Sequence, residues 1–288
     1  MQVQNLQFCY CSTQKNTIKM DTRLTKEEQA MIKEAKGNKV SGPIYSEDGL
    51  RLLKVLGNPE YLEVKDGVKA ICDEACQGLD NLHDVVLPAS VIDLGTRAFA
   101  SCIKLFKITM PGIEFIGTEC FAHCENLKEI ALPETLGKIW KGAFASCKAL
   151  EQINIPSHLK IIDKSAFRSS GLKSLNIVIS EDCKCWIYDR AFAYCKHLES
   201  VYLNKNVKIQ ERMAFAGCTS LTTIEFENPS LTCCAGEINA TMLIGCISLE
   251  KIIVPKNKYN HYPDFNIQGD ESAQFETRDF NSLITPKE

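Results

Sequence analysis

Apolar residues recur along this chain in one pattern that is repeated many times. The segment from Ala143 to Pro156 reads A-F-x-x-C-x-x-L-x-x-I-x-I-P, with mostly polar or small residues at the positions marked x. A repeat of this kind has to be interpreted before any single segment, because it determines the architecture. The other close copies span residues 98–111, 121–133, 166–177, 191–203 and 214–226, and looser copies begin at Ala75 and Met242.

The cysteine of the pattern gives the length of the repeat. Cys124 follows Cys102 by 22 residues and Cys246 follows Cys218 by 28, and these are the extremes of the series. A period of roughly 20–29 residues with Leu, Ile and Cys at fixed offsets is typical of leucine-rich-repeat solenoids. Each coil of such an array buries its apolar side against its neighbours, so we expect about eight stacked coils around one continuous core.

The end of each copy predicts a short β-strand. Ile153 and Ile155 flank Asn154, and this alternation of apolar and polar residues has the period of a strand with one buried face. Equivalent strands of successive coils then form a parallel ladder with about 4.8 Å between neighbours. A proline closes many copies and turns the chain away from the strand. These prolines are Pro88, Pro111, Pro133, Pro156 and Pro255.

The residues before the array predict a cap for its open end. Thr25 and Glu28 have the spacing of a capping box, and Gly37 marks the end of a helix of about three turns. Residues 44–66 predict a hairpin, with its turn at 47–49, followed by a third strand. We divide the chain into a disordered N-terminal tail (1–24), a cap of helix and β-hairpin (25–66), the solenoid (67–263) and a polar C-terminal tail (264–288).

Three coils depart from the common length. Residues 179–185 add two residues to one coil, and residues 228–237 add about five to the last. Insertions in solenoids form loops on one face and often bind ligands, but we interpret both as tolerated changes of length. In a third coil Ser170-Gly171 replaces the cysteine and removes one residue, which predicts a tighter turn.

The repeat resembles a known family. The segments from Ile116 to Cys124 and from Ile139 to Cys147 are very close to I-x-x-x-A-F-x-x-C, with Cys120 in place of the alanine in the first. The full pattern is similar to the BspA-type leucine-rich repeat of bacterial and some protist surface proteins. Residues 45–55 and 254–262 are similar to the hairpin and the closing segment of such arrays. The resemblance covers roughly 68–255. It implies a curved, right-handed solenoid of the α/β class, with the β-ladder on its concave face, and a role in cell-surface adhesion or host contact.

Composition and charge narrow the range of partners. The formal net charge of −3 gives no field that favours nucleic acid, and no apolar run approaches the ~20 residues needed to span a bilayer. Residues 1–20 lack the basic start and the apolar run of a secretory signal. The sequence thus predicts a cytoplasmic location, whereas the resemblance implies the cell surface or secretion, and both stay open.

The fifteen cysteines do not form a recognisable metal or redox motif. Six occupy the repeat position, where a free thiol acts as a small buried apolar group, so we expect them buried and reduced. Cys72/Cys76 and Cys120/Cys124 have the spacing of zinc knuckles, but Cys76, Cys120 and Cys124 fall on core-facing or turn positions of the repeat, which explains them without a metal. No catalytic motif is present, so we predict no cofactor, no metal and no enzyme activity. The alternative is a thiol or zinc protein that uses exposed cysteines, which would be Cys183, Cys185, Cys233 and Cys234.

The outward residues of the predicted ladder form the expected binding face. They are small, polar and of both signs, and they are equally consistent with a solvated sheet surface. Their one aromatic anchor is of the type that dominates interface energies. We interpret the chain as a scaffold that binds another protein, either a host surface or matrix protein or an intracellular one; its oligomeric state is not predicted. The candidate residues are Lys107, Glu129, Gln152, Asn154, Asn176, Tyr202 and Glu225.

Overall fold

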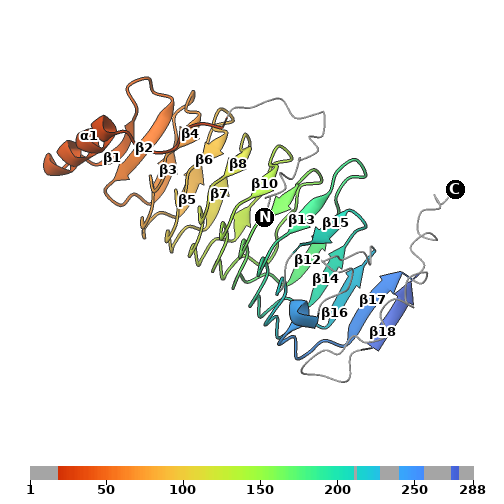
Figure 1. Ribbon diagram of the computed structural model, residues 1–288. Helices are drawn as coiled ribbons and strands as arrows, with labels where there is room; N and C mark the ends of the chain where they lie inside the picture. The colour runs from red at the N-terminus through yellow and green to blue at the C-terminus, as the bar shows by residue number, and fades with distance from the viewer. Residues whose placement is uncertain (1–18, 211–212, 228–239, 256–273, 279–288) are drawn as a thin grey trace, which may run out of the picture.

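The predicted solenoid is confirmed. The computed structural model describes residues 19–210, 213–227, 240–255 and 274–278, which form a β-solenoid of about eight coils (Figure 1). Each complete coil has two straight sides, and strands of successive coils pair in parallel along each side. Three sheets result, which we call ladder A (nine strands), ladder B (four strands) and ladder C (five strands).

Ladder A begins at the cap and runs along one long side of the molecule (Figure 1). Its first strand, β1 (Gly42–Tyr45), is antiparallel to β2 (Arg51–Leu56), as the predicted hairpin requires. The later strands are only two or three residues long, and each carries an inward Ile or Leu. They are β4 (Ala70–Ile71), β6 (Asp93–Leu94), β8 (Phe115–Ile116), β10 (Lys138–Ile139), β11 (Ile161–Ile162), β13 (Cys185–Ile187) and β15 (Val207–Ile209).

Ladders B and C contain the strands that the end of the repeat predicted. The strands of ladder B are β3 (Tyr61–Glu63), β5 (Asp84–Val86), β7 (Lys107–Thr109) and β9 (Glu129–Ile130). Those of ladder C are β12 (Ser174–Ile177), β14 (Ser200–Leu203), β16 (Thr223–Phe226), β17 (Lys251–Pro255) and β18 (Gln274–Arg278). A short 3-10 helix, η1 (Ala240–Leu243), precedes β17. Strand β18 pairs with β17 although it lies in the segment that the sequence assigned to a polar tail.

One strand expected between ladders B and C is missing, so the prediction of a strand at Ile153–Ile155 was wrong. The side chain of Asn154 is the cause. Its Oδ1 accepts a hydrogen bond from the Leu132 amide at 3.0 Å, and its Nδ2 donates one to the Leu132 carbonyl at 2.7 Å. A side-chain amide thus takes the main-chain groups that a neighbouring strand would have paired, and the ladder is divided at this coil.

The core is a column of identical side chains. The phenylalanine of each repeat stacks on that of the next coil, with ring centroids 5.2 to 5.6 Å apart and planes within about 10° of parallel. Leu150 and its equivalents are also fully buried. Stacking of this kind gives a continuous apolar core without any coil being independently stable. The stacked rings are Phe99, Phe121, Phe144, Phe167, Phe192 and Phe215.

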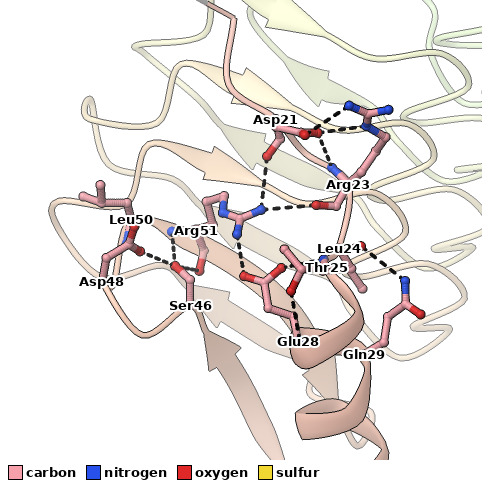
Figure 2. A network of polar contacts seen from close by, with 10 residues as sticks. All are labelled: Asp21, Arg23, Leu24, Thr25, Glu28, Gln29, Ser46, Asp48, Leu50 and Arg51. Atoms are coloured by element: carbon pink, nitrogen blue, oxygen red, sulfur yellow. Dashed lines mark hydrogen bonds and ion pairs between the residues drawn. The ribbon is translucent and has the colours of Figure 1, made fainter.

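The cap is tied to the first coils by a polar network (Figure 2). Helix α1 (Lys26–Gly37) begins with the predicted capping box of Thr25 and Glu28. Arg51 of β2 donates to the carbonyls of Asp21 and Arg23, both at 3.2 Å, and forms an ion pair with Glu28. The helix is therefore held on the hairpin by this guanidinium group and by the packing of Ile32 against Leu53 and Cys72.

Residues 19–24, which the sequence assigned to the N-terminal tail, lie along ladder A. The Met20 amide donates to a carboxylate oxygen of Asp93 at 3.1 Å, and the Thr22 carbonyl accepts from the Asp73 amide at 2.9 Å. Residues 1–18 lie outside the described part of the chain, as does the insertion at 228–237. No helix among the described residues is long and apolar enough to cross a membrane.

The shortened coil lacks the turn that follows the cysteine in the neighbouring coils, so the prediction of a tighter turn there was wrong. The Gly171 amide donates to the Cys147 carbonyl at 3.0 Å, and the glycine packs directly on the preceding coil. A Cβ atom at this position would lie 1.9 Å from the Lys148 carbonyl oxygen, so only glycine fits.

Candidate protein-binding faces

The residues predicted to bind a protein lie on the outward side of ladders B and C and in the coil between them. Lys107 of β7 is in register with Glu129 of β9. In ladder C, Asn176, Tyr202 and Glu225 are in register on three adjacent strands. The structure therefore brings the predicted residues to one side of the solenoid, divided in the middle by the coil that contains Asn154.

Much of this face is paired with itself. The Lys107 ammonium lies 3.0 Å from the Glu129 carboxylate, and the Tyr202 hydroxyl donates to Glu227. The Asn154 amide is occupied by the main chain of Leu132. A partner would have to displace or cover these contacts, which reduces the binding energy that each side chain can supply.

Ladder A presents a second outward face that the sequence did not reveal. The residues on either side of each inward Ile point away from the core, because side chains alternate along a strand. Phe115, Lys138, Ile161 and Trp186 are in register on β8, β10, β11 and β13. We call the partly exposed large side chains of this side the aromatic face. They are Phe115, Trp140, Ile161, Trp186 and Tyr188.

Lysine side chains border the aromatic face. Lys138 Nζ lies 3.3 Å from the ring centroid of Trp140, within cation–π distance, and 3.6 Å from a carboxylate oxygen of Asp163. Burial lowers the pKa of the Lys138 ammonium, and Asp163 opposes this effect. Lys19 Nζ lies 5.3 Å from the same ring, and Lys208 is in register with Trp186.

The signal for this face was present but weak. The strands of ladder A contribute two or three residues each, too few for an alternating pattern to stand out. One feature of the sequence does point to this face. Both tryptophans of the chain are adjacent to the isoleucine that lies four residues before the A-F pair: Trp140 follows Ile139, and Trp186 precedes Ile187.

Comparison with known families agrees with this architecture. The "BspA type Leucine rich repeat region" matches in six copies over residues 69–185 and 170–266. The chain belongs to the BspA-type leucine-rich-repeat family. No curated protein sequence matches this BspA-type chain significantly.

Solved structures of bacterial leucine-rich-repeat proteins are similar to this BspA-type chain. A leucine-rich repeat protein from Bacteroides ovatus is 16% identical, with a TM-score of 0.44, and the match covers 83% of this chain and 91% of that one. A leucine-rich repeat protein from T. pallidum is 22% identical, with a TM-score of 0.45 and coverage of 82% and 98%. The pneumococcal vaccine antigen PcpA is 15% identical, with a TM-score of 0.40 and coverage of 83% of each chain.

The cysteines of the BspA-type repeat are buried, as predicted. All eleven described cysteines are buried free thiols. Ten lie in the core of the coils, and Cys72 packs with Ile32 of helix α1 and Leu53. Burial raises the pKa of Cys102 to about 12, so the reactive thiolate is scarce at neutral pH. The expectation that Cys183 and Cys185 are exposed was wrong: they are 6% and 0% exposed, because the insertion turns both side chains toward the core. Cys233 and Cys234 lie outside the described residues.

Proposed function

We propose that this BspA-type protein is a non-enzymatic scaffold that binds another protein through the aromatic face of ladder A. The observation that carries the proposal is the placement of both tryptophans, Trp140 and Trp186, on one outward surface beside Phe115 and Tyr188. Large aromatic side chains dominate the energy of protein interfaces. Folding of the solenoid does not require them on its outer surface, so their presence there favours a role in binding.

The size of the aromatic face suits the centre of an interface. It extends from β8 through β10 and β11 to β13, which are adjacent strands. Three steps of about 4.8 Å give a patch roughly 14 Å long, comparable to a cluster of hot-spot residues inside a larger contact.

The outward side of ladders B and C is the alternative surface. Tyr202 is its aromatic anchor, and Asn154, Asn176 and Glu225 are the candidates that the sequence grouped with it. The other candidates on this side are Lys107, Glu129 and Gln152. The two surfaces are on different sides of each coil, so substitutions on one leave the other intact. This separation allows the two to be compared directly.

The test captures partners from the native cells with wild-type protein, Trp186→Ala and Tyr202→Ala. Truncation of a hot-spot tryptophan costs at least about 2 kcal/mol, which is roughly a 30-fold loss of affinity. We expect the specific partner of the wild type to bind Tyr202→Ala normally and Trp186→Ala at least 30-fold more weakly. If Tyr202→Ala bound weakly and Trp186→Ala bound normally, the binding site would lie on ladder C. If both variants bound as tightly as the wild type, neither Trp186 nor Tyr202 would be an anchor of the interface.

The biological setting has two proposed forms. Family resemblance suggests adhesion at the cell surface or binding to a host ligand, and the alternative is an intracellular scaffold. Protease treatment of intact native cells separates them. Loss of the protein supports surface adhesion, and full protection directs the search to an intracellular partner.

A further inference from the structure

The insertion at 179–185 brings three possible metal ligands together. A ring nitrogen of His158, a carboxylate oxygen of Asp182 and the Sγ of Cys183 all lie within 4.8 Å of one another. They come from consecutive coils, because His158 precedes the insertion by one repeat. Imidazole, carboxylate and thiolate are the three side-chain ligand types of protein-bound zinc.

The shared turn geometry of the two coils explains this proximity. The Leu159 amide donates to the Pro156 carbonyl, and the Cys183 amide donates to the Ser180 carbonyl, both at 3.1 Å. Cys183 therefore occupies the place of Leu159, and Asp182 occupies the place of His158. Equivalent residues of adjacent coils stack about 4.8 Å apart, so His158 and Asp182 are direct neighbours.

Cys183 differs from the residues that hold this place in the adjacent coils. Leu159 before it and Val207 after it are 0% and 1% exposed, as core residues should be, whereas Cys183 is 6% exposed. The thiol is thus at the boundary of the core, and His158 and Asp182 beside it are both exposed. An ion at this point would be reached from solvent without any change in the core.

His158 is oriented by a second layer of contacts. The Ser157 amide and hydroxyl both donate to a carboxylate oxygen of Glu134 at 3.0 Å, and Ser157 Oγ lies 2.9 Å from Nδ1 of His158. With the hydroxyl proton given to Glu134, the tautomer of His158 that suits this contact carries its proton on Nδ1 and donates it to Ser157 Oγ. The lone pair of the imidazole is then on Nε2, and a hydrogen-bonded Nδ1 of this kind is typical of metal-ligating histidines.

The segment that carries Asp182 and Cys183 is held in place from the following coil. Asn204 and Asn206 each donate to the Ile179 carbonyl, at 2.7 and 3.1 Å, and Asn206 also donates to the Ser180 carbonyl at 3.1 Å. Both ends of the cluster are therefore fixed by hydrogen bonds before any ion binds. Such preorganisation lowers the cost of assembling a metal site.

We propose that His158, Asp182 and Cys183 bind one Zn²⁺ ion. On binding, the Cys183 thiol releases its proton to solvent, and the resulting thiolate, the Asp182 carboxylate and the neutral imidazole complete three of four tetrahedral positions. Water fills the fourth. Zinc–ligand distances of about 2.0–2.3 Å require the ligand atoms to lie about 3.5 Å apart, which small side-chain rotations from the present separation can achieve.

The test titrates the metal-free full-length protein with Zn²⁺, and in parallel with Co²⁺, whose absorption reports thiolate ligation. The informative variants are Cys183→Val and His158→Ala. Valine is the residue that the next coil carries at this place, so Cys183→Val removes the thiol while keeping the core filled. His197→Ala, at an exposed histidine of another coil, is the matched control. Thermal unfolding confirms that each variant is folded.

We expect the wild type and His197→Ala to bind one equivalent with a thiolate-to-cobalt band. Cys183→Val should lose that band, and both it and His158→Ala should bind at least 100-fold more weakly. Ser157→Ala should weaken binding about 10-fold, as the loss of a second-layer contact does. The proposal is overturned if the wild type binds no zinc, or if either Cys183→Val or His158→Ala retains wild-type affinity.

Discussion

The cysteine of the repeat has two structural roles: it fills the core and it donates a hydrogen bond. Its side chain is fully buried beside the phenylalanine column, and its thiol donates a hydrogen bond to a main-chain carbonyl of the preceding coil. Cys147 Sγ lies 3.2 Å from the Phe121 carbonyl, and Cys124 Sγ lies 3.1 Å from that of Phe99. The same contact recurs at Cys195, Cys218 and Cys246. A residue that is both apolar and a weak donor is needed, and cysteine meets both needs.

Replacing Cys147 tests these two roles separately. Cys147→Ala leaves a small cavity and removes one of the two hydrogen bonds to the Phe121 carbonyl, which keeps the bond from the Cys124 amide. The variant should therefore lower the free energy of unfolding by about 1–3 kcal/mol. Cys147→Ser keeps a donor, and serine already stands at this position at Ser170, so its effect should be smaller. Urea unfolding measures both. If the serine variant were the less stable of the two, the hydrogen bond would not explain the preference for a donor.

Asp93 is a buried carboxyl that resists ionisation. Burial raises its pKa from 3.8 to about 6, and Lys19 and the Met20 amide only partly offset this effect. Because the pKa of the folded state is the higher one, the carboxyl favours folding below pH 4, and this contribution is lost as the pH rises through 6.

Asp93→Asn removes that titration. At pH 7.5 the variant should be more stable than the wild type by about 1–3 kcal/mol, because no buried charge has to be maintained. The difference should vanish near pH 4. Denaturant unfolding at the two pH values checks the sign, and a wild type that is the more stable protein at pH 7.5 would show that Asp93 is held ionised by a favourable contact.

At the scale of elements, the strands of ladders B and C followed from the alternation of Ile and polar residues. The break between these ladders did not, because an asparagine at an outward position looks the same in sequence whether its amide faces solvent or caps a neighbouring main chain. The exposure predicted for Cys183 and Cys185 failed for a related reason. The two added residues change which side chains of that coil point inward.

The cap gives an element-scale prediction. Arg51→Lys cannot reach two carbonyls and Glu28 together, so helix α1 should become more mobile, with a loss of about 1–3 kcal/mol in its local stability. Hydrogen exchange of residues 26–37 measures this effect. Arg23→Lys is the control, because the Arg23–Asp21 pair is 81% and 63% exposed and should contribute little. If residues 26–37 exchanged at the same rate in the two variants, Arg51 would not be the residue that stabilises helix α1.

At the scale of the whole molecule, the repeat predicted the solenoid but not how its sides differ. The period determines how the coils stack. Each buried position of the coil can be recognised in the sequence, because equivalent positions of successive repeats carry similar apolar residues. The outward residues vary from coil to coil, so their grouping into surfaces appears only when the register of two ladders is known. This is why the sequence pointed to Tyr202, whereas the structure also assembles the aromatic face.

The most direct test of the proposed function uses the two tryptophans themselves. Protein labelled with fluorotryptophan gives one ¹⁹F resonance each for Trp140 and Trp186, the two tryptophans in the chain. On addition of the captured partner, we predict that both resonances shift and lose their sensitivity to solvent. A saturated complex in which neither resonance changes would contradict binding through the aromatic face.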